Sequence, residues 1–154
     1  LTWISSTSHE ETHRAVYEKK HPGTGDWFLQ EPKFQEWLYS PKSSLLWCYG
    51  KPGAGKSVLA SNVIETVIET FGPEKAVGIC YAYYDYTVAS SQGFVRTILS
   101  LIKQLCRTSA IPDAFKSIKR NADPASTLGD QHGFSTVAKS FTEVFVMIDA
   151  LDEC

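Results

Sequence analysis

The octapeptide Gly50-Lys51-Pro52-Gly53-Ala54-Gly55-Lys56-Ser57 decides the fold, because it matches the pattern G-x-x-x-x-G-K-[ST] at every fixed position. It follows a short apolar run, residues 45–49 (LLWCY), that has the length of a buried strand. It precedes residues 56–71, whose apolar side chains recur at helical spacing until Gly72-Pro73 ends the pattern. A strand, a glycine-rich turn and a helix in this order predict that residues 50–57 bind phosphate groups.

Each residue type in this octapeptide suits an anionic ligand. Gly50, Gly53 and Gly55 allow the backbone to turn tightly, so that consecutive N–H groups point into one concavity. That concavity opens at a helix N-terminus, where the helix dipole favours negative charge. Lys56 is long enough to reach the β- and γ-phosphates, and the Ser57 hydroxyl is the expected ligand of Mg²⁺. The alternative interpretation is a glycine-rich turn that binds nothing.

A second motif lies at the carboxyl end of the chain. Residues 144–148 (VFVMI) are fully apolar and are followed by Asp149-Ala150-Leu151-Asp152-Glu153. In open α/β sheets, ligands bind at the carboxyl ends of the strands, so we expect Asp149 to hold Mg²⁺ directly or through water. Asp152 or Glu153 is the candidate catalytic residue that would polarise an attacking water, and the sequence leaves the choice between them open. An acidic loop without a metal is the alternative.

The rest of the hydrophobic pattern indicates the fold class. Residues 76–84 (AVGICYAYY) predict a further buried strand. Helices are expected over residues 5–20, 26–39, 56–71, 90–107, 111–120 and 134–141. Strands that are apolar throughout and alternate with helices predict an α/β protein, with a parallel sheet between two helical layers.

Composition excludes several classes of protein. The chain has 154 residues, of which 43% are hydrophobic and 21% charged, as expected of one globular domain. Its net charge of −2 indicates neither a nucleic-acid partner nor a membrane partner. No apolar run reaches the roughly 18 residues of a membrane-spanning helix, and the first 30 residues lack a signal peptide. We therefore expect a cytoplasmic protein.

The cysteines and histidines predict no metal centre. None of the four cysteines (Cys48, Cys80, Cys106, Cys154) forms a C-x-x-C pair, so we expect free, buried thiols in a reducing compartment. His9 and His13 are four residues apart and would share a helix face, but no third ligand lies at suitable spacing. Because the single methionine is Met147, we also expect the chain to be a processed product or a piece of a longer protein.

Two long stretches of the chain resemble a known family. Residues 23–65 (GTGDWFLQEPKFQEWLYSPKSSLLWCYGKPGAGKSVLASNVIE) and residues 144–154 (VFVMIDALDEC) are similar to the fungal NACHT-type, nephrocystin-like N-terminal modules. The D-A-x-D-E ending looks like the Walker B motif of the NACHT branch of the STAND nucleotide-dependent switches. The resemblance covers residues 23–154, and we interpret residues 1–22 as a helical linker.

The resemblance carries expectations for single residues. It implies a P-loop NTPase fold in which residues 50–57, the Walker A loop, hold ATP or GTP and Asp149 serves Mg²⁺. Asp152 and Glu153 then match the family's additional acidic pair. It also implies that residues 23–27 lie just upstream of the core. There they either approach the nucleobase or form a structural turn in which Trp27 packs into the core. Asp85 either faces the site or is an ordinary loop residue.

The chain departs from the family pattern at its carboxyl end. It stops one residue after Glu153, whereas the resemblance implies a further strand that inserts between the strands at 45–49 and 144–148. We therefore expect a domain truncated after the Walker B strand. If the family's strand order holds, we expect unpaired backbone groups in the open slot to make the isolated chain marginally stable or prone to aggregate. A three-stranded sheet, with 144–148 directly beside 45–49, is the alternative.

Three functions follow from these patterns. The leading one is a nucleotide-binding switch module of a signalling NTPase that hydrolyses slowly, with ankyrin or WD repeat domains of a longer parent as partners and with possible self-association. We expect this piece alone to be incomplete for hydrolysis. The second is a truncated structural fragment that binds nucleotide weakly or not at all. The third is a P-loop kinase, which is disfavoured because the chain has only four arginines, none of them in a lid-like cluster.

Overall fold

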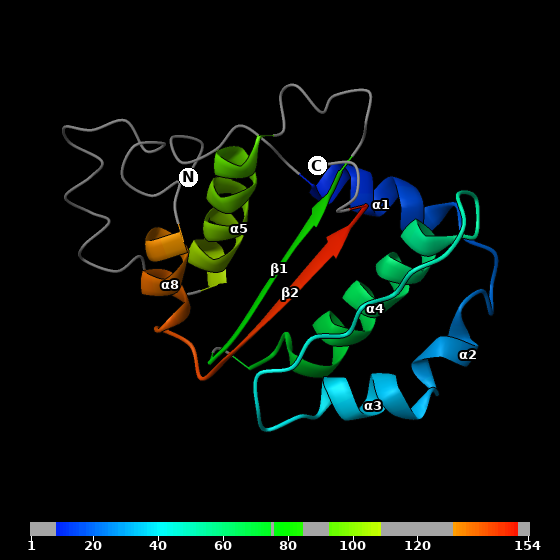
Figure 1. Ribbon diagram of the computed structural model, residues 1–154, viewed down its shortest axis with the longest axis horizontal. Coiled ribbons are helices and arrows are strands. Elements are labelled where there is room, and N and C mark those ends of the chain that lie inside the picture. Colours follow the sequence, from blue (N-terminus) through cyan, green and yellow to red (C-terminus); the bar gives the residue numbers. More distant parts are fainter. Residues whose placement is uncertain (1–8, 75, 85–92, 109–130, 151–154) are drawn as a thin grey trace.

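A computed structural model describes residues 9–74, 76–84, 93–108 and 131–150 (Figure 1). The elements in these ranges are α1 (Glu10–Glu18), α2 (Asp26–Leu29), α3 (Pro32–Leu38), α4 (Lys56–Phe71), β1 (Val77–Tyr83), α5 (Phe94–Thr108), α8 (Gln131–Ala138) and β2 (Glu143–Asp149). Several expectations fall outside the described residues, namely those for Asp85, the helix at 111–120, Asp152, Glu153 and Cys154.

The sheet of the described residues consists of two parallel strands. β1 pairs with β2 so that Val77 lies opposite Glu143 and Tyr83 lies opposite Asp149. Both strands lie within about one residue of the predicted ranges 76–84 and 144–148. The prediction of an α/β protein with a parallel sheet is therefore confirmed at this level.

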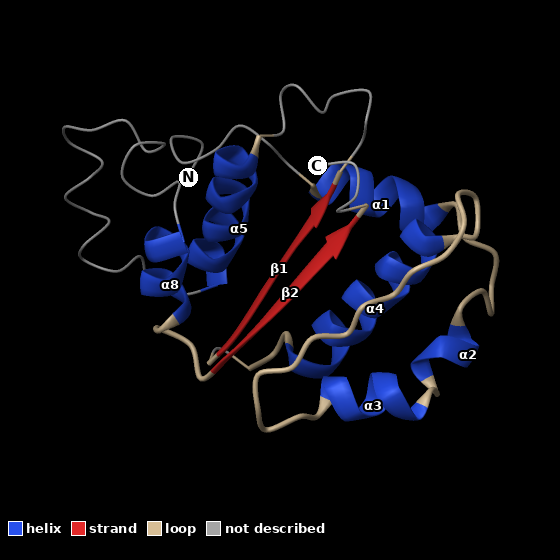
Figure 2. Cartoon of the chain, viewed as in Figure 1, coloured by secondary structure: helices blue, strands red, loops and turns tan. Residues whose placement is uncertain are grey.

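Helices cover both faces of the sheet, because β1 sends alternate side chains to opposite sides. Cys80 and Ala82 pack with Ile102, Leu105 and Val137 of α5 and α8. Tyr81 and Tyr83 lie on the other face, where Phe145 and Met147 of β2 meet α3 and α4 through Phe34, Leu38, Ile64 and Val67. Figure 2 shows this order, with α5 and α8 on one side of the strands and α4, α3 and α2 on the other.

The expected strand at residues 45–49 does not form, and the proposed three-stranded sheet is wrong. Leu45 and Tyr49 are 85% and 88% exposed, and the segment has no regular secondary structure. A strand requires a neighbour that pairs with its backbone, and in the described part of the chain β2 pairs only with β1. The segment instead follows α4 at a distance from the free edge of β2 (Figure 1).

The amino-terminal part is fastened to α4 by polar side chains. Asn62 is buried on α4; its Oδ1 accepts a hydrogen bond from Lys20 Nζ at 2.6 Å, and its Nδ2 donates to the carbonyl of Thr24. Gly25 has φ 84°, and a Cβ atom there would lie 2.5 Å from Asn62 Nδ2. Only glycine therefore fits this turn. Trp27, by contrast, is 63% exposed, so the expectation that it packs into the core is wrong.

Candidate functional site

The loop at residues 50–55 lies exposed at the N-terminus of α4. Gly53 and Gly55 have φ angles of 77° and 81°, in the left-handed region that favours glycine. No atom lies within 4 Å of the position that a side chain would take at either residue. Ala54 N–H donates to the Lys51 carbonyl at 3.1 Å and tightens the turn. The predicted binding residues Gly50, Lys51, Pro52, Gly53, Ala54 and Gly55 are all exposed to solvent here.

Lys56 is the first residue of α4, and its side chain folds back over this loop. Its Nζ donates to the carbonyl of Gly50 at 3.0 Å and to the carbonyl of Lys51 at 3.4 Å. The ammonium group is thus held at the loop by two backbone oxygens. Ser57 follows in the first helical turn and is half-buried. A positive charge, a hydroxyl and a helix N-terminus therefore meet at one place.

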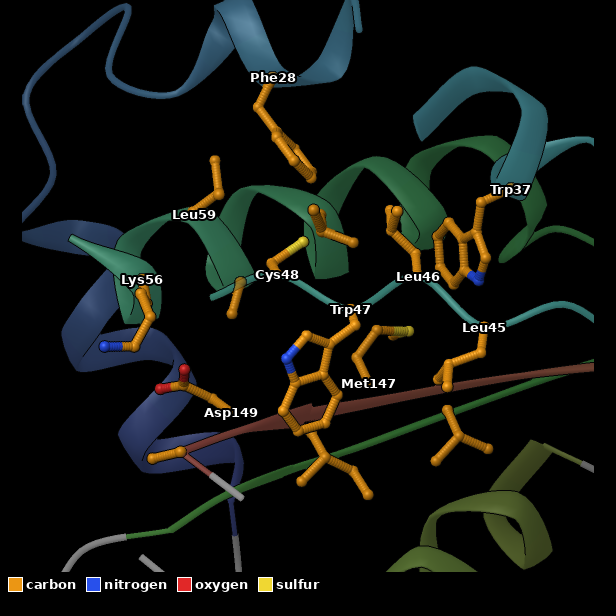
Figure 3. Close-up of a pocket in the computed structure, with 15 residues that line it drawn as sticks. Phe28, Trp37, Leu45, Leu46, Trp47, Cys48, Lys56, Leu59, Met147 and Asp149 are labelled. Carbon is orange, nitrogen blue, oxygen red and sulfur yellow. The ribbon is translucent and has the colours of Figure 1, made fainter. Parts of the chain in front are cut away.

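Asp149 ends β2 at the same edge of the molecule. It is buried, and it lines one cavity together with Lys56; Figure 3 shows both charged groups at the same end of that cavity. The Asp149 carbonyl accepts a hydrogen bond from Tyr84 N–H at 3.2 Å. Ala150 then has φ 55°, a conformation that is rare for a residue with a side chain, so the chain turns sharply after the carboxylate.

The neighbouring strand presents Tyr83 beside Asp149. Burial raises the pKa of the Tyr83 hydroxyl above its ordinary value, and the negative charge of Asp149 raises it further. Tyr83 is therefore a neutral hydrogen-bonding group at physiological pH, and it does not neutralise the carboxylate.

A groove runs along the free edge of β2. Its first part is a cavity of about 250 Å³ between α4, the segment 45–48 and β2, with an apolar lining that includes Phe28, Trp37, Trp47, Leu59 and Met147 (Figure 3). A second cavity of about 620 Å³ continues past residues 40–45 and 141–146. The two share Trp37, Leu45 and Val146 in their linings. The glycines of the loop line neither cavity, but Lys56 and Asp149 line the first, so the groove reaches the candidate phosphate site at one end.

The thiols follow the prediction only in part. Cys80 and Cys106 are free and buried, and burial raises the pKa of both, so they are poor nucleophiles. Cys48 is free but exposed, which contradicts its expected burial in a strand. The described residues contain no cluster of three His, Cys, Asp or Glu side chains able to hold a metal ion. Among these residues, no helix combines the length and apolarity needed to cross a membrane.

The family described as "Nephrocystin 3, N-terminal" matches residues 23–154. The chain belongs to this family. It is also 24% identical over 139 residues to the vegetative incompatibility protein HET-E-1 of Podospora anserina, a match that covers 83% of this chain and 10% of that protein. No solved structure matches the chain. The two matches confirm the resemblance to fungal NACHT-like, nephrocystin-like N-terminal regions.

The relationship to HET-E-1 is limited in extent. This chain spans about a tenth of that protein's length, so most of HET-E-1 has no counterpart in the sequence compared. Within this limit, the similarity to HET-E-1 supports the assignment to a NACHT-like family. Membership of that family is a coarse indication of a nucleotide-binding signalling module.

Sequence reasoning missed three polar residues that the fold buries, namely His9, His13 and Asn62. A partial signal was present for each. His9 and His13 have i, i+4 spacing, and Asn62 stands with Ser61 between apolar residues of a predicted helix. What could not be read from the sequence is which distant group each residue binds.

Proposed function

We propose that this chain is a nucleotide-dependent switch module. In this proposal residues 50–57 bind the phosphates of ATP or GTP, and Ser57 and Asp149 bind the accompanying Mg²⁺. One observation carries this proposal: the left-handed glycine loop opens at the N-terminus of α4 with Lys56 folded over it, on the edge of the molecule where Asp149 ends β2. Parallel strands and the helices that follow them place such ligand sites at the carboxyl edge of the sheet.

The residues fit the proposed ligand. The loop offers backbone N–H groups and space, Lys56 offers a positive charge, and the Ser57 hydroxyl and Asp149 carboxylate are oxygen ligands of the kind Mg²⁺ prefers. A bound Mg²⁺ would neutralise charge on the phosphates. In this proposal Asp152 or Glu153 would orient and deprotonate the attacking water, and slow hydrolysis would reset the switch. Repeat domains of a longer parent, or a second copy of the chain, would respond to its state.

A second candidate function is a structural piece without nucleotide affinity. The open apolar groove beside β2 favours it, because among the described residues β2 has a paired strand on one side only. The two candidates differ in whether nucleotide stabilises the folded protein.

A thermal melt of residues 1–154 with and without millimolar Mg-ATP, Mg-ADP or Mg-GTP tests the proposal. Nucleotide at about 100 times its Kd should add about 2.7 kcal/mol to the free energy of unfolding. That gain corresponds to a rise in Tm of about 5–10 °C for a chain of this size. Lys56→Ala should abolish the rise, and Lys33→Ala, an exposed lysine on α3, should leave it unchanged.

Two outcomes would count against nucleotide binding at this site. If no nucleotide shifts the melt of a chain that unfolds cooperatively, the structural alternative holds for this chain. If nucleotide stabilises Lys56→Ala as much as the unaltered chain, the ligand binds somewhere other than residues 50–57.

A further inference from the structure

Two buried histidines attach α1 to the body of the protein. His9, the residue before α1, is 4% exposed, and His13 on its inner face is 6% exposed. Both contact Tyr83, at the carboxyl end of β1. Figure 1 shows α1 lying across this end of the two strands and beside α4. Histidine is the side chain whose charge changes between pH 5 and 8. Because these two histidines are buried where α1 packs on β1, their charge affects how tightly α1 packs there, which we call the docking of α1.

His13 is satisfied whether or not it carries a second proton. Its Nε2 lies 2.6 Å from Glu65 Oε1 of α4, and its Nδ1 lies 2.9 Å from the Tyr83 hydroxyl. The hydroxyl donates to Nδ1 when the ring is neutral and accepts from Nδ1–H when the ring is charged. The Tyr81 ring lies 5.0 Å away, centroid to centroid. His13 therefore fastens α1 at either charge state.

His9 is different, because its surroundings accommodate only the neutral ring. Its Nδ1 accepts a hydrogen bond from the backbone N–H of Tyr83 at 3.2 Å. Its Nε2 is buried and has no hydrogen-bond partner among the described residues. A proton on Nδ1 would face the N–H of Tyr83 donor to donor, and the resulting charge would be buried without a counter-ion in contact among the described residues. Protonation of His9 thus opposes the docked position of α1.

Polar contacts, more than apolar burial, hold α1 in place. His13 is the buried residue within α1, and Val16 is only partly buried against the core. At the surface, Glu10 pairs with Arg107 of α5, and an exposed pair of this kind contributes little stability. Lys20, beyond the helix, donates to the buried Asn62 side chain. A helix held in this way is released by a modest change in charge.

We propose that α1 is an acid-released latch on the carboxyl end of β1, docked while His9 is neutral and released when His9 takes up a proton. Release would free the Tyr83 backbone and side chain from α1. Because Tyr83 lies opposite Asp149 in the sheet, the latch acts on the edge where Asp149 ends β2.

Charged and titratable groups face the junction from each element packed against it. Glu65 of α4, Asp149 of β2, Arg107 of α5 and the two tyrosines Tyr81 and Tyr83 of β1 face it, besides Glu10 and Arg14 of α1 itself. Burial, with Glu10 and Glu65, raises the pKa of Tyr81 to about 12, and burial raises that of Tyr83 as well, so neither tyrosine titrates near neutral pH.

The sign of the pH effect follows from the burial of His9. Burial lowers the pKa of His9 below its ordinary value of 6.5 in the docked state. An undocked α1 returns His9 to water and to that ordinary value. Above about pH 6.5 neither state binds the proton, so docking does not depend on pH. Below it the undocked state gains the proton first, and the docking equilibrium weakens by up to about tenfold per pH unit.

Hydrogen exchange of the whole chain between pH 5.0 and 7.5 tests the latch. The protection factors of α1 amides, corrected for intrinsic exchange rates, should be constant above about pH 6.5 and fall by up to about tenfold per unit below it. Amides of α4 should keep their protection. His9→Asn retains an acceptor for Tyr83 N–H but cannot titrate, so it should remove the pH dependence. His21→Asn and His132→Asn replace exposed histidines and should retain it.

Several results would overturn the latch. One is constant protection of α1 down to pH 5.0; another is a wild-type pH profile in His9→Asn. If His9→Asn leaves α1 unprotected at every pH, the NMR titration of His9 in the unaltered chain decides. The latch requires His9 to protonate together with the loss of α1 protection, and protonation while α1 stays protected refutes it.

Discussion

Replacement of Asn62 by alanine should lower the free energy of unfolding by about 2 kcal/mol, which is large for a polar residue on a helix. The substitution removes the bonds from Lys20 Nζ to Asn62 Oδ1 and from Asn62 Nδ2 to the Thr24 carbonyl. A neutral hydrogen bond contributes about 0.5–1.5 kcal/mol net and a bond to a charged group about 1.5–3 kcal/mol. We take the lower end of both ranges because Lys20 is only half-buried and Thr24 is exposed.

Urea denaturation followed by circular dichroism measures this loss, and the matching fall in Tm is about 4–8 °C. A double-mutant cycle with Lys20→Ala isolates one bond, and the two residues should couple by about 1.5 kcal/mol, the share assigned to that bond. Glu69→Ala, an exposed position on the same helix, serves as the control and should stay within about 0.5 kcal/mol. The reasoning fails if Asn62→Ala lowers the free energy of unfolding no more than the control does. It also fails if Asn62→Ala lowers that free energy equally in the presence and in the absence of Lys20.

Two further predictions concern the core and the free edge of β2. Phe145→Ala should cost about 3–5 kcal/mol in urea denaturation, because its ring is buried against Phe71 at 4.9 Å, while Trp27→Ala at an exposed position should cost far less. Val146→Lys with Ile148→Lys places charges on exposed positions of β2 and should reduce concentration-dependent association in light scattering, with little change in stability. Unchanged association in that variant would show that another surface is responsible.

Local patterns in the sequence predicted the elements whose formation depends on local chemistry. The helix expected at 56–71 is observed with the same bounds, because its apolar spacing and the Gly72-Pro73 stop are both internal to it. The strand ranges were predicted almost as well, since fully apolar runs bounded by turns leave little choice once a parallel sheet forms. The tight turn of the phosphate-loop pattern likewise depends only on the glycines within it.

Elements that need a partner could not be predicted in the same way. The run at 45–49 has the composition of a strand, but a strand exists only where another backbone pairs with it. The same dependence explains Cys48 and Trp27, whose apolar character suggested burial, although both are exposed. Hydrophobic residues are frequently found at the surface, so composition alone does not place a particular side chain inside.

The polar contacts between distant residues could not be predicted from the sequence for a different reason. His9 and Tyr83 are separated by 74 residues, His13 and Glu65 by 52, and Lys20 and Asn62 by 42. Nothing in the sequence near either member of these pairs specifies the other. The spacing of His9 and His13 indicated a shared helix face, but only the packing of α1 on β1 shows that this face is buried.

The parallel pairing of β1 and β2 is what brings the separate findings together. Strands that run in one direction end at one edge, so Tyr83 and Asp149 become neighbours although 66 positions separate them in the chain. At that edge lie the phosphate loop and α4, and α1 packs against both α4 and the end of β1 through His13. A change in docking that displaces Asp149 would therefore alter ligand binding at the loop. By thermodynamic reciprocity, a ligand that fixes Asp149 would in turn strengthen the docking of α1 by the same free energy.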